Sequence, residues 1–276
     1  MADIPLPKAF HLSTASGERF CIYHPAKERA ARTAILYIHP FAEEMNKSRR
    51  MANLQSRALA ARGYSVLQLD LNGCGDSSGD FGDATWQSWR DDISLAWDWL
   101  QARHQSVFLW GLRLGATLAL DFANVNNRWP SGFLIWQPVL NGEIFMSQFL
   151  RLRVASEMME GVKAGGVQVL RDSLKRGESV EVAGYRLNPE LVHQIDSMQV
   201  RKIIPKSPHI CWLEIVAEQG QTASPVATQT KEIWRQAQID FTFDTVVGPA
   251  FWATQEIVDC PALIQRTIDY MELRSA

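Results

Sequence analysis

Residues 106–120 read SVFLWGLRLGATLAL, and this stretch decides the fold. Its first part is a short apolar run typical of a buried β-strand, and its last part is a small and apolar run typical of a buried helix. Gly111 and Gly115 bracket the junction. Glycine at both positions indicates a crowded, strained turn in which a side chain would collide with the adjoining strand and helix. The stretch therefore predicts a strand that turns sharply into a helix, with Arg113 at the apex.

Strand-like apolar runs and helical patterns alternate on both sides of this unit. We expect strands at 20–23, 34–38, 66–71, 132–137, 210–216 and 241–247, and helices at 51–62, 86–103, 228–237 and 260–273. The alternation predicts an α/β protein with a mostly parallel sheet flanked by helices on both faces.

One region breaks this rhythm. The stretch 144–160 is amphipathic, and 180–187 looks extended around Gly184. We therefore expect 143–205 to form a largely helical cap that folds over the carboxyl edge of the sheet. Residues 1–142 and 206–276 would form the core.

Composition narrows the class of protein. The 276 residues carry a net charge of -2, and the chain has no long basic block, so nucleic acid is not an expected partner. Residues 1–10 do not read as a signal peptide. The most apolar stretch, 107–123, contains Arg113 and Asp121, so no membrane span is expected.

The 4 cysteines are widely spaced without a CxxC pair, which favours reduced thiols, a cytoplasmic location and no metal site. We expect no cofactor, and a small-molecule substrate or ligand.

The order of the elements resembles the α/β-hydrolase fold, and three local motifs carry the resemblance. They are His39-Pro-Phe, the DLNGCGDSSG loop at 70–79, and GLRLG at 111–115. The last matches the G-x-S-x-G nucleophile elbow of that superfamily, except that Arg113 stands at the nucleophile position. A guanidinium is always protonated and cannot attack a carbonyl.

A narrower group is also similar. The runs HPFAEEMNKSRRM (39–51), WGLRLG (110–115) and GPAFW (248–252) resemble the second type of hydrolase associated with exosortase A systems, which are encoded beside PEP-CTERM protein-sorting genes. This resemblance implies a bacterial cytoplasmic protein linked to sorting and exopolysaccharide gene clusters. It implies a hydrolase label without a defined substrate.

The remaining catalytic positions also depart from the superfamily pattern. The acid should follow the strand at 210–216, where Glu218 is one plausible carboxylate, and the histidine should follow the last strand. The last histidine of the chain is His209, so none lies there. A Ser-His-Asp esterase mechanism is therefore not expected. Two functions stay open: a divergent hydrolase or acyl- or anion-binding protein, and a catalytically inactive scaffold or partner-binding protein in the same pathway.

The sequence leaves two hypotheses open for the role of Arg113. Arg113 forms a structural ion pair, for which Glu43 and Glu44 are the first candidate partners and Glu218 the second, or it captures an anionic ligand at the start of a helix. A pocket under the cap with Arg113 at its floor would suit an amphiphile with an acidic group.

Eight other residues complete the expected site region. The resemblance implies that the backbone amides of Phe41 and Leu114 form an oxyanion hole, so both residues should share the pocket floor with Arg113. His39 is expected to shape its loop through backbone hydrogen bonds rather than to act in catalysis. Cys74 and Ser77 could replace the nucleophile, but Ser in such a glycine-rich turn more often bonds local backbone. Trp110, Trp136 and Trp252 should lie near the same edge of the sheet, mostly in the core.

Overall fold

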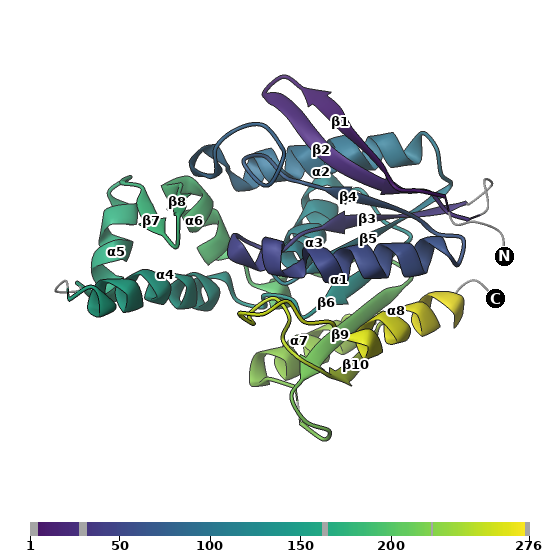
Figure 1. Cartoon of the computed structure of the whole chain (residues 1–276). Coiled ribbons are helices and arrows are strands. Elements are labelled where there is room, and N and C mark those ends of the chain that lie inside the picture. The colour runs from purple at the N-terminus through teal and green to yellow at the C-terminus, as the bar shows by residue number, and fades with distance from the viewer. Residues whose placement is uncertain (1–4, 28–31, 162–164, 222, 274–276) are drawn as a thin grey trace.

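A mixed eight-stranded sheet forms the centre of the molecule (Figure 1). The computed structural model describes residues 5–27, 32–161, 165–221 and 223–273. The strands are β1 (Lys8–Thr14), β2 (Gly17–His24), β3 (Thr33–Ile38), β4 (Ser65–Leu69), β5 (Ser106–Leu112), β6 (Gly132–Trp136), β9 (Ile210–Val216) and β10 (Thr242–Val247). Their order is β1-β2-β4-β3-β5-β6-β9-β10, and all pairs from β4 to β10 are parallel. Within this sheet, β1 with β2 and β2 with β4 pair antiparallel.

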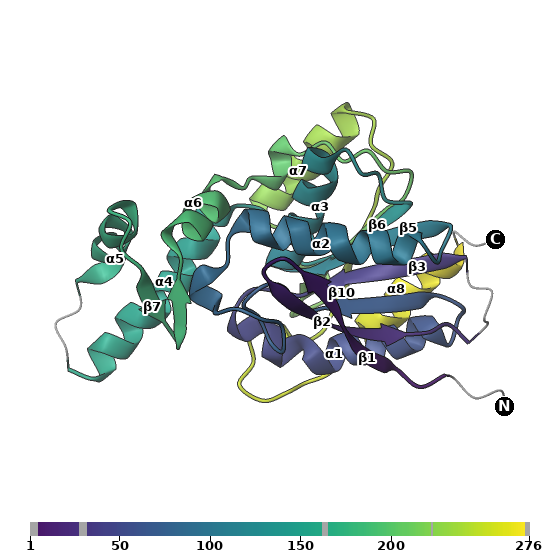
Figure 2. The ribbon, with the colours of Figure 1, turned by 90° about the horizontal axis from the view of Figure 1, so that it is seen from above.

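Helices cover both faces of this sheet, as Figures 1 and 2 show. The covering helices are α1 (Glu43–Ala60) and α8 (Pro261–Leu273) on one face, and α2 (Trp86–Gln101), α3 (Leu114–Asn126) and α7 (Pro225–Gln236) on the other. Each face has its own apolar core, and the central strands are buried on both sides. The architecture is the α/β-hydrolase fold that the sequence predicts.

The segment between β6 and β9 extends beyond the carboxyl ends of the parallel strands (Figure 1). It contains α4 (Gly142–Met159), α5 (Gly166–Lys175), a small hairpin of β7 (Val180–Val182) and β8 (Tyr185–Leu187), and α6 (Pro189–Ser197). Aromatic contacts join this segment to the sheet edge: the ring of Phe41 lies 5.7 Å from that of Phe145 and 5.1 Å from that of Phe149.

Several elements differ from the sequence-based expectation. Helix α1 begins at Glu43 rather than at Met51. The sequence pattern did not reveal this earlier start, because the first turns are polar apart from Met45 and show no apolar periodicity. Glu43 and Glu44 therefore lie in the first turn of this helix. Strand β1 was not expected, and its largely exposed edge position explains its weak pattern. Helices α5 and α6 were also not expected.

Candidate functional site

Arg113 occupies a strained backbone conformation at the turn from β5 into α3. Its φ of 54° and ψ of -121° are unusual for a residue with a side chain. The glycines on either side are required by space. A Cβ at Gly111 would lie 2.3 Å from Cα of Ala116, and one at Gly115 would lie 2.3 Å from the carbonyl oxygen of Ile38. The turn has the geometry of a nucleophile elbow, with a guanidinium where the nucleophile would be.

The guanidinium of Arg113 is held by one carboxylate and two aromatic rings. Its Nε donates to Oε1 of Glu44 over 3.1 Å, and its Cζ lies 5.8 Å from the ring centre of Phe145 and 5.4 Å from that of Trp252. The ion pair expected from the sequence is therefore present, and Glu44 rather than Glu43 forms it. Within the described residues, the two terminal nitrogens of Arg113 have no hydrogen-bond partner, so they remain available as a fork of donors.

The environment of Glu44 disfavours the charged form of its carboxyl group. Burial raises the pKa of Glu44 to about 7, although the adjacent Arg113 lowers it. Its second oxygen, Oε2, is buried and has no hydrogen-bond partner in the described part of the chain, and the same holds for Oε2 of Glu43. The site thus contains a carboxyl group that can bind or release a proton near neutral pH.

A pocket of about 470 Å³ opens beside Arg113, between the ends of β6 and β9, the start of α4 and the start of α7. Its polar lining comprises Arg113, Gln137, Asn141, Gln148, Glu214, Gln221 and Ser224. The apolar lining includes Leu140, Ile144 and Phe145 from the segment after β6, and Ile215, Val216 and Val226 from β9 and α7.

The expected pocket floor is partly wrong. Phe41 and Leu114 do not line the Arg113 pocket; their side chains are only 3% and 2% exposed. The hollow that they border with His39 and Trp89 has a volume of about 10 Å³, room for roughly one water molecule. The rings of Phe145 and Phe149 pack against Phe41 and occupy this part of the site. The backbone N–H groups of Phe41 and Leu114 make no hydrogen bond within the described residues.

Gln137 and Asn141 are pocket residues that the sequence did not identify. Gln137 follows β6 directly and has a φ of 43°, so it shares with Arg113 a backbone conformation that is rare outside glycine. Asn141 is the N-cap of α4. Their positions just after a parallel strand were the available signal, because ligands of α/β sheets bind at the carboxyl ends of the strands.

His39 uses both ring nitrogens to hold its loop. Nδ1 bonds to the carbonyl oxygen of Pro40 over 2.7 Å, which makes Nδ1 the donor, and Nε2 accepts from the N–H of Leu71 over 3.2 Å. Burial lowers the pKa of His39, so the neutral form is favoured. These contacts agree with the loop-shaping role expected for His39.

The 70–79 loop is likewise held by internal bonds. The Ser77 hydroxyl donates to the carbonyl oxygen of Asp70 over 2.6 Å and accepts from the N–H of Phe20 over 2.8 Å. Burial raises the pKa of the Cys74 thiol, which suppresses its thiolate. Ser77 therefore stabilises the turn through backbone hydrogen bonds, as expected for a serine in a glycine-rich turn.

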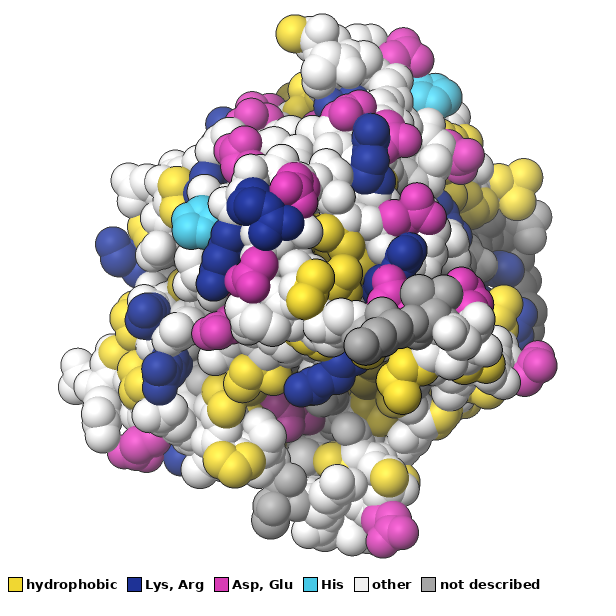
Figure 3. Space-filling model, turned by 90° about the vertical axis from the view of Figure 1, so that its left-hand side faces the viewer, with side chains coloured by type: hydrophobic (Ala, Val, Ile, Leu, Met, Phe, Trp, Pro, Cys, Tyr) yellow, Lys and Arg dark blue, Asp and Glu magenta, His cyan; other side chains and the backbone are white. Residues whose placement is uncertain are grey.

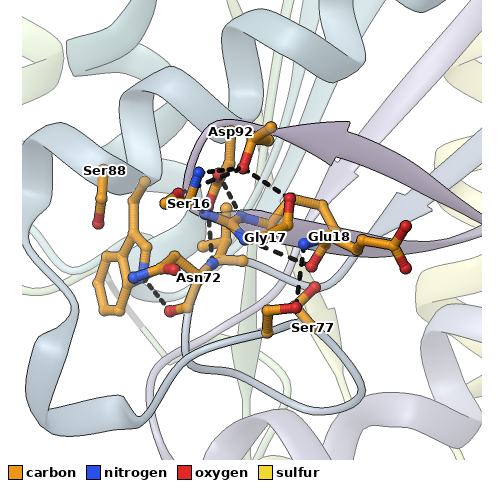
Figure 4. Close-up of polar contacts among 12 residues, drawn as sticks. Ser16, Gly17, Glu18, Asn72, Ser77, Ser88 and Asp92 are labelled. Carbon is orange, nitrogen blue, oxygen red and sulfur yellow. Dashed lines mark hydrogen bonds and ion pairs between the residues drawn. The ribbon is translucent and has the colours of Figure 1, made fainter.

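A buried ion pair anchors this loop to the sheet and to α2 (Figure 4). Arg19 Nε donates to Asp92 Oδ1 over 2.5 Å, and the other Asp92 oxygen accepts from the N–H of Asn72 over 2.6 Å. Arg19 and Asp92 are 1% and 2% exposed. The network fixes the loop that precedes α2.

The other positions considered from the sequence lie outside the pocket. Glu218 is exposed and does not line it. Trp110 and Trp136 are buried in the core and also do not line it, whereas Trp252 lies beside Arg113. Trp252 belongs to the GPAFW run after β10, the region in which the hydrolase pattern would place a histidine.

The described residues form neither a metal-binding group nor a membrane-spanning helix. They contain no group of three or more His, Cys, Asp and Glu side chains arranged to hold a metal ion. In the same part of the chain, every helix is too short or too polar to cross a membrane.

The chain is similar to known proteins in both sequence and fold. Residues 29–203 match the family model described as serine aminopeptidase, S33. Human protein ABHD12B is 32% identical over 107 residues, which are 38% of this chain and 28% of that protein. The thermostable monoacylglycerol lipase of Bacillus sp. (strain H-257) is 30% identical over 89 residues, 32% of this chain and 34% of the lipase. The matched segments thus span about a third or less of these relatives.

Solved structures resemble the whole chain. Est1E from Butyrivibrio proteoclasticus, solved with ferulic acid bound, superposes with a TM-score of 0.62 at 13% identity over 96% of this chain and 100% of its own. The α/β-hydrolase GrgF from Penicillium sp. sh18 gives a TM-score of 0.63 at 14% identity, covering 98% of this chain and 99% of its own. These similarities concern the fold alone. By its family match and its architecture, the chain belongs to the serine aminopeptidase S33 family of the α/β-hydrolase superfamily.

Proposed function

We propose that this protein is an α/β-hydrolase-family member with a degenerate triad, which binds an anionic small molecule where its relatives would form an acyl-enzyme. The observation that carries the proposal is the Arg113 side chain. It occupies the elbow position, and Arg113 lines a pocket of about 470 Å³. A guanidinium at that point can bind a carboxylate or phosphate but cannot attack one.

The surroundings of Arg113 support binding over acyl transfer. The neighbouring side chains are Glu44, Phe145 and Trp252, and none of them is a nucleophile with an adjacent base. The N–H groups of Phe41 and Leu114 would be the relict oxyanion hole, and the hollow of about 10 Å³ beside them is too small for an ester carbonyl and its substituents. Glu218 would be the relict acid.

The ligand we propose is an acyl or other amphiphilic anion, with its acidic group at Arg113 and its apolar part against Ile144 and Phe145. In this arrangement 143–205 acts as a cap over the core of 1–142 and 206–276. The monoacylglycerol lipase among the relatives acts on an acyl substrate by its name, which is compatible with an acyl ligand here. If the chain retains hydrolytic activity, it uses a mechanism without an acyl-enzyme.

The biological setting we propose is that of the exosortase A systems. Two of the runs that resemble the exosortase-associated hydrolases contact Arg113. The GPAFW run supplies Trp252, and the HPFAEEMNKSRRM run supplies Glu44. We therefore place the protein in the bacterial cytoplasm, beside PEP-CTERM sorting and exopolysaccharide functions.

A second candidate function is a catalytically inactive scaffold that binds a protein of the same pathway. Apolar side chains exposed on α4 and α5 favour it, namely Ile144, Leu152, Met158, Met159 and Val169. Figure 3 shows the end of the molecule that carries these helices, with apolar side chains interspersed among charged ones. Such a mixed surface suits a polar protein partner more than a lipid bilayer.

Thermal unfolding with matched ligands tests the proposal. Decanoate should raise the melting temperature more than methyl decanoate, because only the acid can bind the Arg113 fork. Arg113→Gln should lose this preference. Arg171→Gln is the matched control, since Arg171 is also mostly buried and ion-paired, to Asp196, but lies away from the pocket. Equal shifts by the acid and its ester, or an unchanged preference in Arg113→Gln, would refute anion binding at the elbow.

A further inference from the structure

Gln137, Asn141 and Gln221, three of the four amide residues that line the Arg113 pocket, have side chains oriented by the backbone; the fourth, Gln148, makes no such bond among the described residues. Each of the three uses its oxygen to accept a hydrogen bond from a main-chain N–H, and because an N–H only donates, the atom it meets must be the amide oxygen. The pairs are Gln137 Oε1 with Ile215 N–H at 2.6 Å, Asn141 Oδ1 with Ile144 N–H at 3.0 Å, and Gln221 Oε1 with Ala217 N–H at 3.1 Å.

The consequence is a pocket rich in hydrogen-bond donors. The NH₂ groups of Gln137, Asn141 and Gln221 have no hydrogen-bond partner among the described residues, and the same is true of the Arg113 terminal nitrogens. The Ser224 hydroxyl also keeps its proton for donation, because its oxygen accepts from the N–H of Ala227. A ligand that matches this lining must supply acceptors.

Three helices begin at this pocket and add to the same preference. Arg113 is the N-cap of α3, Asn141 that of α4 and Ser224 that of α7, and all three residues line the pocket. Each helix is longer than ten residues and directs the positive end of its dipole at the pocket. The dipoles alone would not define a site; here they act together with a cation and a set of fixed amide donors.

Two carboxyl groups oppose an anion here. Glu44, in the first turn of α1, partly neutralises Arg113, and Glu214 of β9 lines the pocket. Burial raises the pKa of both groups, which makes their charged forms less favourable. Because Gln137 and Asn141 reach the pocket from the segment after β6, an anion held by them and by Arg113 uses donors that neither carboxylate occupies.

From this arrangement we propose that the pocket is an oxyanion site in which Gln137 and Asn141 are specificity-determining residues beside Arg113. The ligand group is a phosphate monoester or a carboxylate, chosen for the number of acceptor oxygens that it offers to fixed N–H donors. This inference rests on the proposed binding function and assigns the residues that select the ligand.

Isosteric acids test the assignment. Asn141→Asp and Gln137→Glu keep the oxygen that accepts the backbone N–H, but they replace the NH₂ donor by a negatively charged oxygen. Asn188→Asp is the matched control. Asn188 caps α6 in the same way, by accepting from the N–H of Glu190, and it does not line the pocket. An aspartate caps a helix as well as an asparagine, so Asn141→Asp and Asn188→Asp should fold. Gln137→Glu should fold because it keeps the oxygen that accepts from the N–H of Ile215.

The measurement is calorimetric titration with glycerol phosphate, acetate and uncharged glycerol. Glycerol phosphate or acetate should bind the wild type, and glycerol should not. Asn141→Asp and Gln137→Glu should weaken binding by at least about tenfold, whereas Asn188→Asp should leave it unchanged. The stronger of the two anions identifies the ligand group.

Other results separate this inference from the proposed function. If Arg113→Gln abolishes binding but Asn141→Asp and Gln137→Glu do not, anion binding at the elbow stands and the role of the amides is refuted. If decanoate stabilises the protein through Arg113 while neither small anion binds, the oxyanion selectivity is refuted in the same way. If Arg113→Gln changes no binding at all, both proposals fail.

Discussion

The Nε of Arg113 donates to Oε1 of Glu44 over 3.1 Å, so the apex of the turn between β5 and α3 is tied to the first turn of α1. The two side chains are 19% and 13% exposed, which places the pair in a region where an unpaired charge is costly. This contact links the two strand–helix units at the centre of the sheet, because β3, which precedes α1, pairs directly with β5. Arg113 thus joins the elbow to α1 through an ion pair, which a serine at this position could not form.

Replacing the arginine should therefore destabilise the fold. We expect Arg113→Ser to lower the free energy of unfolding by about 3 kcal/mol at pH 8, because it leaves Glu44 buried without its cation. Adding Glu44→Gln should recover part of the loss, since no buried charge then remains. Urea unfolding of the two variants measures both effects, and an Arg113→Ser protein as stable as the wild type would exclude a stabilising pair.

The elbow glycines should be intolerant of any side chain. In Gly115→Ala the new Cβ would lie 2.3 Å from the carbonyl oxygen of Ile38, so we expect a loss above about 3 kcal/mol. Gly184→Ala is the control, because Gly184 has a φ of 82° but open space around it. Its cost should be about 1 kcal/mol, the strain of the backbone alone. Similar losses in both variants would show that the turn is not crowded.

The sequence predicted the sheet and the elbow well for a physical reason. Buried parallel strands and a glycine-bracketed turn are dictated by local sterics and apolar runs, as in residues 106–120. The choice of Glu44 over Glu43 could not be predicted, because it depends on the exact start of α1. The first turns of that helix are polar, so no periodic pattern marks where it begins.

The pocket was harder to predict than the fold. Its lining comes from the residues after β6, from β9 and from the start of α7, which are far apart in the chain. The side chains of Phe145 and Phe149 fill the space beside Phe41 where the hydrolase pattern would place a substrate carbonyl. Such filling depends on how the segment after β6 packs, and single-sequence patterns do not report it.

Covalent serine-hydrolase probes should not label this protein. A fluorophosphonate needs an activated hydroxyl, and Ser77 has both of its hydrogen-bonding roles committed to backbone groups. Mass spectrometry after incubation with the probe should find no adduct on the 70–79 loop or the elbow. Arg113→Ser should also remain unlabelled, because no base stands beside the new hydroxyl. An adduct on either segment would restore a nucleophilic mechanism.

The buried pair of Arg19 and Asp92 should be a stronger stability determinant than the surface pairs. Arg19→Met leaves the Asp92 carboxylate buried with only the N–H of Asn72 as a donor, so we expect a loss of about 3–5 kcal/mol. Arg62→Met, which breaks the exposed pair with Glu272, should cost less than about 1 kcal/mol. Chemical denaturation compares the two, and equal losses would contradict this ranking.

The protonation of Glu44 should impose a pH dependence on stability. Burial raises its pKa from 4.5 to about 7 in the folded protein, so the folded state holds the proton more tightly than the unfolded state. The resulting stabilisation is complete below pH 4.5 and is lost as the pH rises through about 7. The Glu44 contribution to this fall would be about 3 kcal/mol at most.

Glu44→Gln should remove that contribution, because an amide does not titrate in this range. The free energy of unfolding measured at intervals from pH 4.5 to pH 8 should therefore fall less steeply in Glu44→Gln than in the wild type. Glu218→Gln is the control: Glu218 is exposed, so its replacement should leave the slope unchanged. Parallel curves for Glu44→Gln and the wild type would mean that Glu44 stays ionised throughout. In that case Glu44 would neutralise Arg113 throughout this pH range, and an anion would bind the terminal nitrogens of Arg113 against the charge of that carboxylate.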